Sequence, residues 1–108
     1  GHSNCAGVKA ITNSKNELEE YEYHNEWINL GKEMYSTIET KKKETETLYD
    51  EIEKKMISKS IDNLMSYKWI KDKVGKSELS LIGMHFSIGD CSISQLENST
   101  KKFRIITD

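Results

Sequence analysis

A helical spacing of apolar residues, carried through more than half of the chain without a proline, constrains this sequence more than any other feature. Over residues 23–38, and again over 48–74, an apolar side chain recurs every three or four residues. That period places the apolar side chains on one face of an amphipathic helix. Gly75 follows the last apolar position, where a helix commonly ends in a left-handed cap. The spacing predicts a helical region over about residues 15–74.

The apolar face is interrupted once, between residues 39 and 47, where all nine residues are polar. A single continuous helix would be about 87 Å long at 1.5 Å per residue and would need a partner chain to cover its apolar face. A helical hairpin that turns in the gap would cover that face internally, although the gap contains none of the usual turn residues. The sequence leaves both arrangements open.

The distribution of charge favours antiparallel packing of helices in either arrangement. The net charge of −2 conceals a balance of −6 over residues 1–53 and +4 over residues 54–108. A turn near residue 42 would place the acidic segment 17–26 opposite residues 58–67, and an antiparallel pair of helices from two chains would do the same. Exposed ion pairs add only ~0–1 kcal/mol each, but they select one orientation.

Beyond the helical region the apolar period changes to that of a β-strand. Apolar and polar residues alternate, Gly89-Asp90 is typical of a hairpin turn, and residues 98–100 are typical of a second turn. We therefore expect a small antiparallel β-sheet over about residues 78–107. The predicted fold class is α+β, with a long helix or antiparallel helical hairpin over about 15–74 followed by this sheet.

The amino-terminal residues are expected to lie outside this plan. Gly1–Ser3 look like the remnant of a cleaved expression tag and are set aside, which leaves residues 4–108 as a single domain. Its helical part is expected over 15–74 and its β part over 76–108. Residues 8–11 are compatible with a short strand in an otherwise irregular lead-in.

The two cysteines, Cys5 and Cys91, are candidates for one disulfide that would tie the amino terminus to the sheet. Two free thiols in a cytosolic protein, or a lipid-bearing Cys5, are the alternatives. A disulfide in a domain with only 35% apolar residues favours an extracytoplasmic location, periplasmic or secreted. A removed amino-terminal anchor would place the domain near a membrane.

No motif for catalysis, a cofactor or a metal emerges from the sequence. The segment 75–77 lacks the earlier glycine of a phosphate-binding loop. Glu20 and His24 lie one helical turn apart, but a pair on a helix surface is the simpler interpretation. His85 alternates with two apolar neighbours and is therefore expected on the exposed face of its strand. We predict neither enzymatic activity nor a bound metal or other cofactor.

Two sets of apolar residues are candidates for binding. The helical face would bind a protein partner, because Trp and Tyr dominate the energetics of interfaces; its candidates are Tyr23, Trp27, Met34, Ile38, Leu48, Ile52, Met56 and Trp69. The junction of helix and sheet would form a pocket for a small ligand, with the candidates Tyr67, Trp69, Met84 and Phe86.

The function predicted from these features is a non-enzymatic protein-interaction domain of an exported or membrane-anchored protein. It would act as a sensor or accessory subunit that pairs, in the manner of a coiled coil, with itself or with another protein through its helices. A small cytosolic inhibitor or immunity-type protein, or a sensor for a small apolar ligand, are the alternatives. An isoelectric point near 6.0 and the single arginine, Arg104, argue against a nucleic-acid partner.

Overall fold

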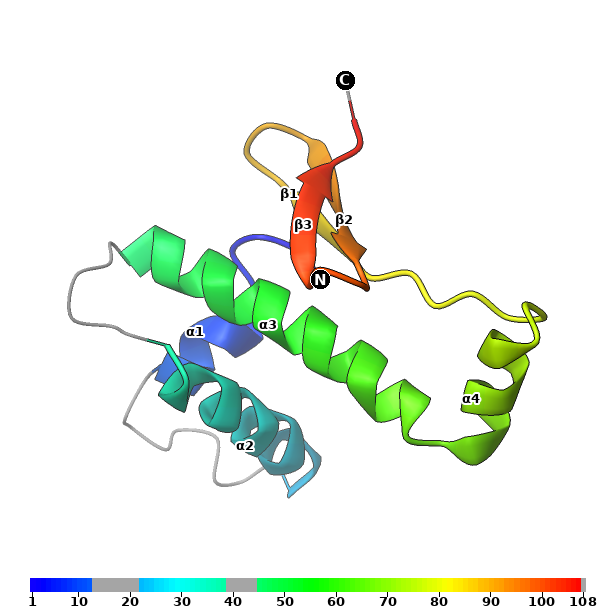
Figure 1. The fold of residues 1–108 in the computed structure, drawn as a ribbon. Helices are drawn as coiled ribbons and strands as arrows, with labels where there is room; N and C mark the ends of the chain where they lie inside the picture. The colour runs from blue at the N-terminus through cyan, green and yellow to red at the C-terminus, as the bar shows by residue number, and fades with distance from the viewer. Residues whose placement is uncertain (13–21, 39–44, 108) are drawn as a thin grey trace.

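The computed structural model describes residues 1–12, 22–38 and 45–107 of the 108. Within them it has four helices and a three-stranded sheet (Figure 1). The helices are α1 (Ala6–Thr12), α2 (Glu22–Ser36), α3 (Thr45–Met65) and α4 (Lys68–Gly75), and the strands are β1 (Met84–Ser87), β2 (Ser92–Glu97) and β3 (Lys102–Ile105). The prediction of a mixed α and β fold is confirmed.

The three strands form an antiparallel meander with β2 in the centre. Both turns lie where the sequence predicts them, at residues 88–91 and 98–101. In the first turn, Asp90 accepts hydrogen bonds from the backbone N–H and the hydroxyl of Ser92, at 3.1 and 2.8 Å. Hydrogen bonds from the hydroxyls of Ser87 and Ser92 lower the pKa of the Asp90 carboxyl. The charged carboxylate therefore stabilises the turn.

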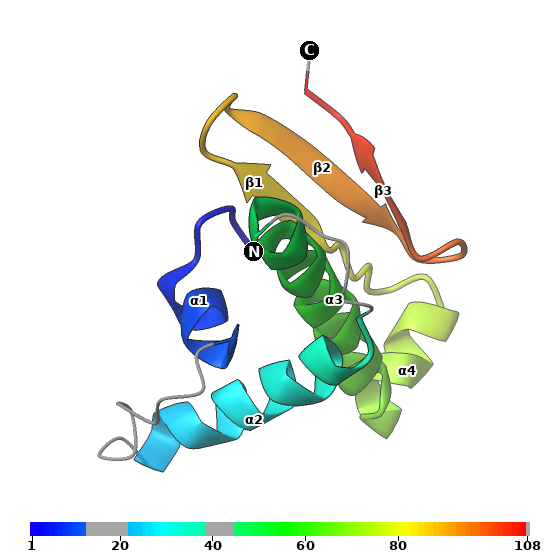
Figure 2. The same ribbon diagram turned by 90° about the vertical axis from the view of Figure 1, so that its left-hand side faces the viewer.

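The amino-terminal residues belong to the fold and pair with β1 in parallel. The N–H of Ser3 donates to the carbonyl of Phe86 (2.8 Å), and the N–H of Phe86 donates to the carbonyl of Gly1 (3.0 Å). His2 and Phe86 are the partners of this parallel bridge, and the chain start lies beside β1 in Figure 2. Gly1–Ser3, set aside above as a tag remnant, therefore lie against the sheet, and the fold is not simply helices followed by strands.

A second correction concerns the residues that follow. The short strand expected at residues 8–11 is instead part of α1. Val8 and Ile11 are both buried and lie three residues apart, which is the spacing of one helix face. The apolar residues of this segment therefore have the helical spacing. The segment is too short for that spacing to be recognised in the sequence.

The helical region is divided, so one continuous helix over 15–74 is wrong. The chain reverses between α2 and α3, and α2 crosses α3 rather than lying along it (Figure 2). Lys59 of α3 lies 3.9 Å from Glu33 of α2, and Lys55 donates to the hydroxyl of Thr37 at 2.7 Å. The predicted turn at 39–47 falls largely outside the described residues, as does half of the acidic segment 17–26.

A further break separates α3 from α4 at Ser66 and Tyr67. The hydroxyl of Ser66 donates to the carbonyl of Asn63 at 2.6 Å, which offers the backbone an alternative to a helical bond. At the far end of α4, the left-handed residue is Ser77 (φ 59°), two positions beyond the glycine that was expected to cap the helix. None of the described helices has the length and apolar content needed to cross a membrane.

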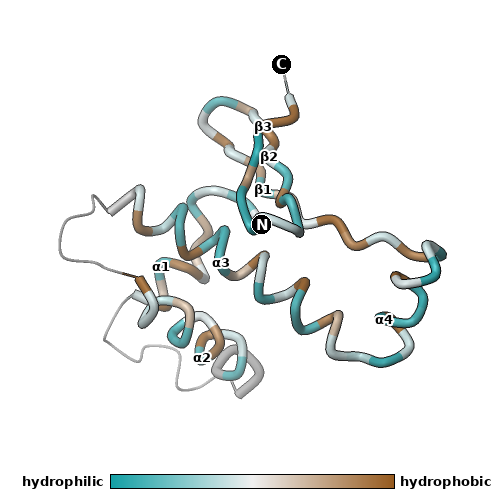
Figure 3. The backbone as a smooth tube through the Cα atoms, in the orientation of Figure 1, coloured by the Kyte–Doolittle hydropathy of each residue, from teal (hydrophilic) through white to brown (hydrophobic). Residues whose placement is uncertain are grey.

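The main hydrophobic core lies where α1, α2 and α3 meet. Along α3 hydrophobic and hydrophilic residues alternate with the helical turn (Figure 3). The buried members of this cluster share an aliphatic side chain and are Val8, Ile11, Ile28, Ile38, Ile52 and Met56. The helical face therefore finds most of its cover within the chain.

The sheet turns the opposite face inward from the one predicted. His85 is buried, with 3% of its surface exposed, whereas Met84 and Phe86 on either side are 42% and 40% exposed. The inward face packs on α3, where Glu53 bonds to His85 at 2.8 Å. A polar group can be buried when its hydrogen bonds are satisfied, and hydropathy alternation alone does not reveal such a partner.

Close packing of α1 on α2 depends on Gly31. A Cβ atom at this position would overlap the side chain of Ile11 and lie 2.7 Å from its Cγ1 atom. We expect Gly31→Ala to lower the free energy of unfolding by about 1–2 kcal/mol, because overpacking outweighs the gain in helix propensity. Thermal or denaturant unfolding followed by circular dichroism would measure the change.

Gly75→Ala is the matched control, since nothing lies within 4 Å of a Cβ atom there. It should leave stability unchanged or slightly raised. Adding Ile11→Val to Gly31→Ala should restore part of the loss. If Gly31→Ala proved as stable as the parent, α1 would not pack on α2 as closely as described.

Candidate metal centre

An imidazole and a thiol lie three residues apart at the start of the chain. His2 sits in the segment that pairs with β1, and Cys5 immediately precedes α1, where its carbonyl accepts the N–H of Lys9 at 3.1 Å. Side chains that follow a strand of a parallel pair and precede a helix gather at one edge of the sheet. Imidazole and thiolate are the donors that zinc takes most often in proteins.

One nitrogen of the His2 ring contacts the backbone. Its Nδ1 atom lies 2.9 Å from the carbonyl oxygen of Ser3. Because a carbonyl can only accept, Nδ1 must carry a proton, and in the neutral ring Nε2 then carries the lone pair. A ligating histidine commonly donates its other ring N–H to a backbone carbonyl in this way. The hydroxyl of Ser3 in turn accepts the N–H of Ile88 at 2.8 Å.

Both donors line a cavity of about 210 Å³ between the amino terminus, α1, α2 and α3. Its walls are largely apolar and include Val8, Trp27 and Met56, and Glu53 also lines it. A metal held by His2 and Cys5 would therefore face a small space with few polar groups. Such a space suits a small uncharged molecule better than an ion.

Beneath Cys5 lies a buried carboxylate. Glu53 of α3 is only 4% exposed. Its Oε1 atom accepts the backbone N–H of Cys5 at 3.2 Å, and its Oε2 atom lies 2.8 Å from Nε2 of His85. The carboxylate therefore connects α3, the start of α1 and β1 at one point.

The same carboxylate is part of a second set of metal-ligand types. One ligand atom each from Asp50, Glu53 and His85 lies within 4.8 Å of the others, and Asp50 approaches His85 to 3.9 Å. No buried polar side-chain atom among the described residues lacks a hydrogen-bond partner. A metal ion here would have to break the bond between Glu53 and His85, so we interpret this set as a hydrogen-bonded network.

The two cysteines are not joined. Both are free thiols, with Cys5 half-buried at the start of α1 and Cys91 exposed in the turn between β1 and β2. The structure thus contradicts the predicted disulfide, because Cys5 faces the metal-site cavity. Cys91 has a left-handed backbone (φ 55°), and its Sγ lies 3.9 Å from the carbonyl of Ile88.

The candidates for partner binding divide into core and surface. Ile38, Ile52 and Met56 are buried in the core, and Met34 and Leu48 pack against it. Trp27 is partly exposed, and Trp69 is exposed on α4. The side chain of Tyr23 lies outside the described residues. Most of this set therefore supports the fold from within.

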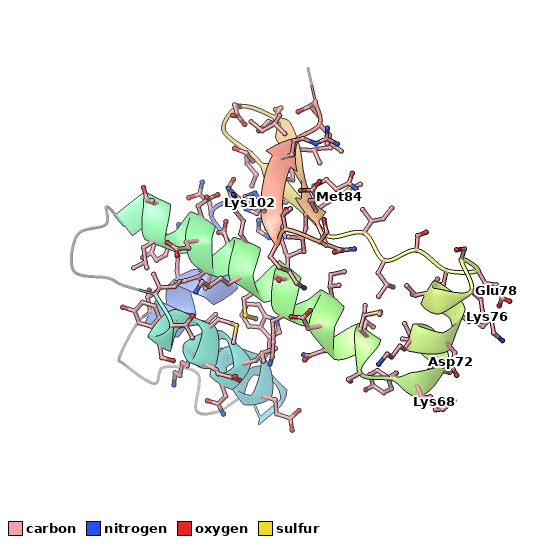
Figure 4. The ribbon with its side chains drawn as sticks, in the orientation of Figure 1. Lys68, Asp72, Lys76, Glu78, Met84 and Lys102 are labelled. Atoms are coloured by element: carbon pink, nitrogen blue, oxygen red, sulfur yellow. The ribbon has the colours of Figure 1, made fainter. Side chains whose placement is uncertain are left out.

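The candidates for a ligand pocket are not brought together. Tyr67 and Trp69 are exposed at α4, whereas Met84 and Phe86 are exposed on the outer face of the sheet. Figure 4 shows Met84 on the sheet and Lys68 on α4, at well separated places. None of these four residues lines the cavity beside His2.

Comparison with known proteins identifies the family. Residues 1–93 match the carbonic anhydrase family, and the chain belongs to it. The chain is 31% identical over 107 residues to the mitochondrial β carbonic anhydrase 6 of Arabidopsis thaliana, across 94% of this chain and 36% of that protein. It is 29% identical over 99 residues to the chloroplastic β carbonic anhydrase 5 of the same plant, across 88% of this chain and 32% of that protein.

A solved structure supports the fold. The β-carbonic anhydrase CcaA superposes with a TM-score of 0.71 at 24% sequence identity, over 97% of this chain and 52% of that chain. At this identity the likeness concerns the fold alone. The chain spans about a third of the length of the two plant relatives and about half of the chain of CcaA.

The family overturns the function predicted from sequence. The chain belongs to a family of enzymes, so the predictions of a non-enzymatic interaction domain, of a sensor and of a protein without enzymatic activity are wrong. The names of the plant relatives place those proteins in a mitochondrion and a chloroplast, which lends no support to an extracytoplasmic location.

Sequence reasoning missed His2 and Cys5 as a pair. The signal was a His-x-x-Cys spacing followed by the small residues Ala6 and Gly7, which permit a close turn into a helix. It was lost because His2 was assigned to a tag and Cys5 to a disulfide.

The thiol state provides a direct check. Under native, non-reducing conditions an alkylating reagent should add two labels to the metal-free chain, the exposed Cys91 reacting faster than the half-buried Cys5. Intact-protein mass spectrometry would count the labels, and peptide mapping would order the two rates. A chain that takes up no label until it is reduced would contain the disulfide and contradict the structure.

Proposed function

We propose that this chain supplies part of the active site of a β-type carbonic anhydrase, which interconverts carbon dioxide and bicarbonate. In this proposal His2 and Cys5 are two of the protein ligands of a zinc ion. The observation that carries it is the position of the two donors in a member of the carbonic anhydrase family, beside each other at one edge of the sheet and on one largely apolar cavity.

The donor set fits zinc. Nε2 of His2 is free to coordinate because Nδ1 is engaged with the carbonyl of Ser3. Cys5 is a free thiol that borders the cavity, and it would bind as a thiolate. Zinc in carbonic anhydrases acts as a Lewis acid and lowers the pKa of a coordinated water to about 7.

The residues around the donors would serve the substrate and the ligands. The apolar side chains of Val8, Trp27 and Met56 would admit carbon dioxide, which is small and carries no charge, and would keep bulk water out. The backbone bonds between Gly1, Ser3 and Phe86 would hold His2 in place while the reaction proceeds.

Two donors do not complete a catalytic zinc site, which takes three protein ligands and one open position. Among the described residues no third ligand type groups with His2 and Cys5. We therefore propose that at least one more ligand comes from outside the described residues, either from further sequence or from another chain. The limited share of the plant relatives that this chain spans agrees with that view.

The activity is tested by removing the donors one at a time. His2→Ala and Cys5→Ser should each weaken zinc affinity by more than the roughly 100-fold that changes outside the ligand shell reach. They should also abolish carbon dioxide hydration, measured by stopped-flow with a pH indicator in the protein that carries the complete site. Cys91→Ser removes the other thiol and should leave zinc content and rate unchanged. Retention of stoichiometric zinc by Cys5→Ser would disprove the assignment.

The surface that we propose for a protein partner differs from the one expected from the sequence. The outer face of the sheet exposes Met84, Phe86, Ile88 and Ile106, and exposed apolar groups of this size commonly mark an interface. We propose that this face pairs with a second copy of the chain. This proposed pairing does not involve the apolar face of the helices, because most of that face is buried in the core.

Light scattering would test the pairing. Ile106→Glu together with Phe86→Glu should shift a dimer towards monomer, because two charges would be desolvated in the interface. Trp69→Ser removes an even more exposed apolar side chain from α4 and should leave the mass unchanged. A parent chain that remains monomeric at high micromolar concentration would count against this surface.

A further inference from the structure

The buried carboxylate beneath the metal donors has no role in the proposal above. Glu53 is almost fully enclosed, and an enclosed carboxylate is stable only when its oxygens are bonded. One oxygen is occupied by the N–H of Cys5 and the other by His85. Because an ionised carboxylate can only accept hydrogen bonds, His85 must donate from Nε2.

The hydrogen bonds of Glu53 connect it to the segments that carry both donors. Towards α1 the carboxylate holds the backbone of Cys5 directly. Towards the sheet it holds His85, whose neighbour Phe86 exchanges two backbone bonds with Gly1 and Ser3 on either side of His2. The relative position of the imidazole and the thiol is therefore tied to a single side chain of α3.

We propose that Glu53, anchored by His85, is a positioning residue that sets the backbone of Cys5 at its distance from His2 and so preorganises the metal site. The inference rests on the assignment of His2 and Cys5 as zinc ligands. Glu53 touches neither metal nor substrate in this scheme. It acts through the orientation of a ligand, as groups outside the ligand shell commonly do.

The competing explanation is that Glu53 only stabilises the fold. The two explanations differ in which part of the chain a substitution of Glu53 would loosen. Loss of a positioning contact should loosen Cys5 in a protein that stays folded, whereas loss of general stability should loosen Cys5 and the core of α3 alike. Amide hydrogen exchange followed by NMR distinguishes them without any metal.

Three variants of the 108-residue chain are compared with the parent. Glu53→Ala removes both bonds, Glu53→Gln keeps an oxygen that can accept from Cys5, and Glu53→Asp keeps the charge but is shorter by one methylene. Glu78→Gln is the matched control, since Glu78 is exposed and lies beyond α4, well away from β1 (Figure 4).

In the metal-free proteins, the amide of Cys5 should exchange roughly 10-fold faster in Glu53→Ala, while the amide of Ile52 in the core keeps its rate. Glu53→Gln should exchange at close to the parent rate. If Glu53→Ala does not fold, Glu53→Asp should give the same local increase. An equal increase at Cys5 and Ile52, or none at either, overturns the proposal.

Zinc titration against a chromophoric chelator provides the second measurement. Zinc affinity should fall about 10- to 100-fold in Glu53→Ala and less in Glu53→Gln, and it should not change in Glu78→Gln. This titration uses the protein that carries the complete site, because two donors alone do not complete it. Failure of that parent protein to bind zinc would count against the proposed ligands, and the exchange data would then still decide whether Glu53 positions Cys5. Unchanged affinity in Glu53→Ala, with a parent that binds zinc, overturns the positioning role.

Discussion

The buried pair of Glu53 and His85 is the interaction on which the arrangement of helices and sheet depends. A charged carboxylate inside a protein costs several kcal/mol unless its oxygens are bonded, so α3 and β1 can pack in this way only with the two side chains in register. The pair selects the inward face of the sheet and leaves the apolar side chains of the neighbouring positions outside. Because the second oxygen of the carboxylate bonds to Cys5, the same point holds the start of α1.

The two donors of the candidate metal site lie at the start of the chain, but the groups that hold them come from distant parts of it. Gly1–Ser3 reach β1 across more than eighty residues, and the parallel bridge between them brings His2 to the edge of the sheet. A parallel pairing needs a long connection, which here is the whole helical part of the chain. The helices therefore serve the site in two ways, since they form the crossover and one of them carries the carboxylate that holds Cys5.

Membership of the carbonic anhydrase family and the apolar outer face of the sheet both concern groups that the described residues do not supply themselves. The chain matches about a third of the length of its plant relatives, and in the proposal above it supplies two of the three protein ligands that a catalytic zinc takes. In the proposals above, a second copy of the chain covers the exposed apolar sheet face, and residues outside the described ones complete the ligand set.

The sequence by itself determined much of the local structure of this protein beyond residue 12. Its helical spacing, its two turns and its strand alternation predict helices followed by a small antiparallel sheet, because these features follow from neighbouring residues alone. Only the tertiary structure decided that Gly1–Ser3 join the sheet, that Cys5 lines a cavity instead of a disulfide, and that His85 rather than Met84 faces inward. Each of these depends on a hydrogen-bond partner distant in the chain, and apolar periodicity contains no information about such partners. The His-x-x-Cys spacing was readable in the sequence, but its chemistry became visible only when both residues had a place in the fold.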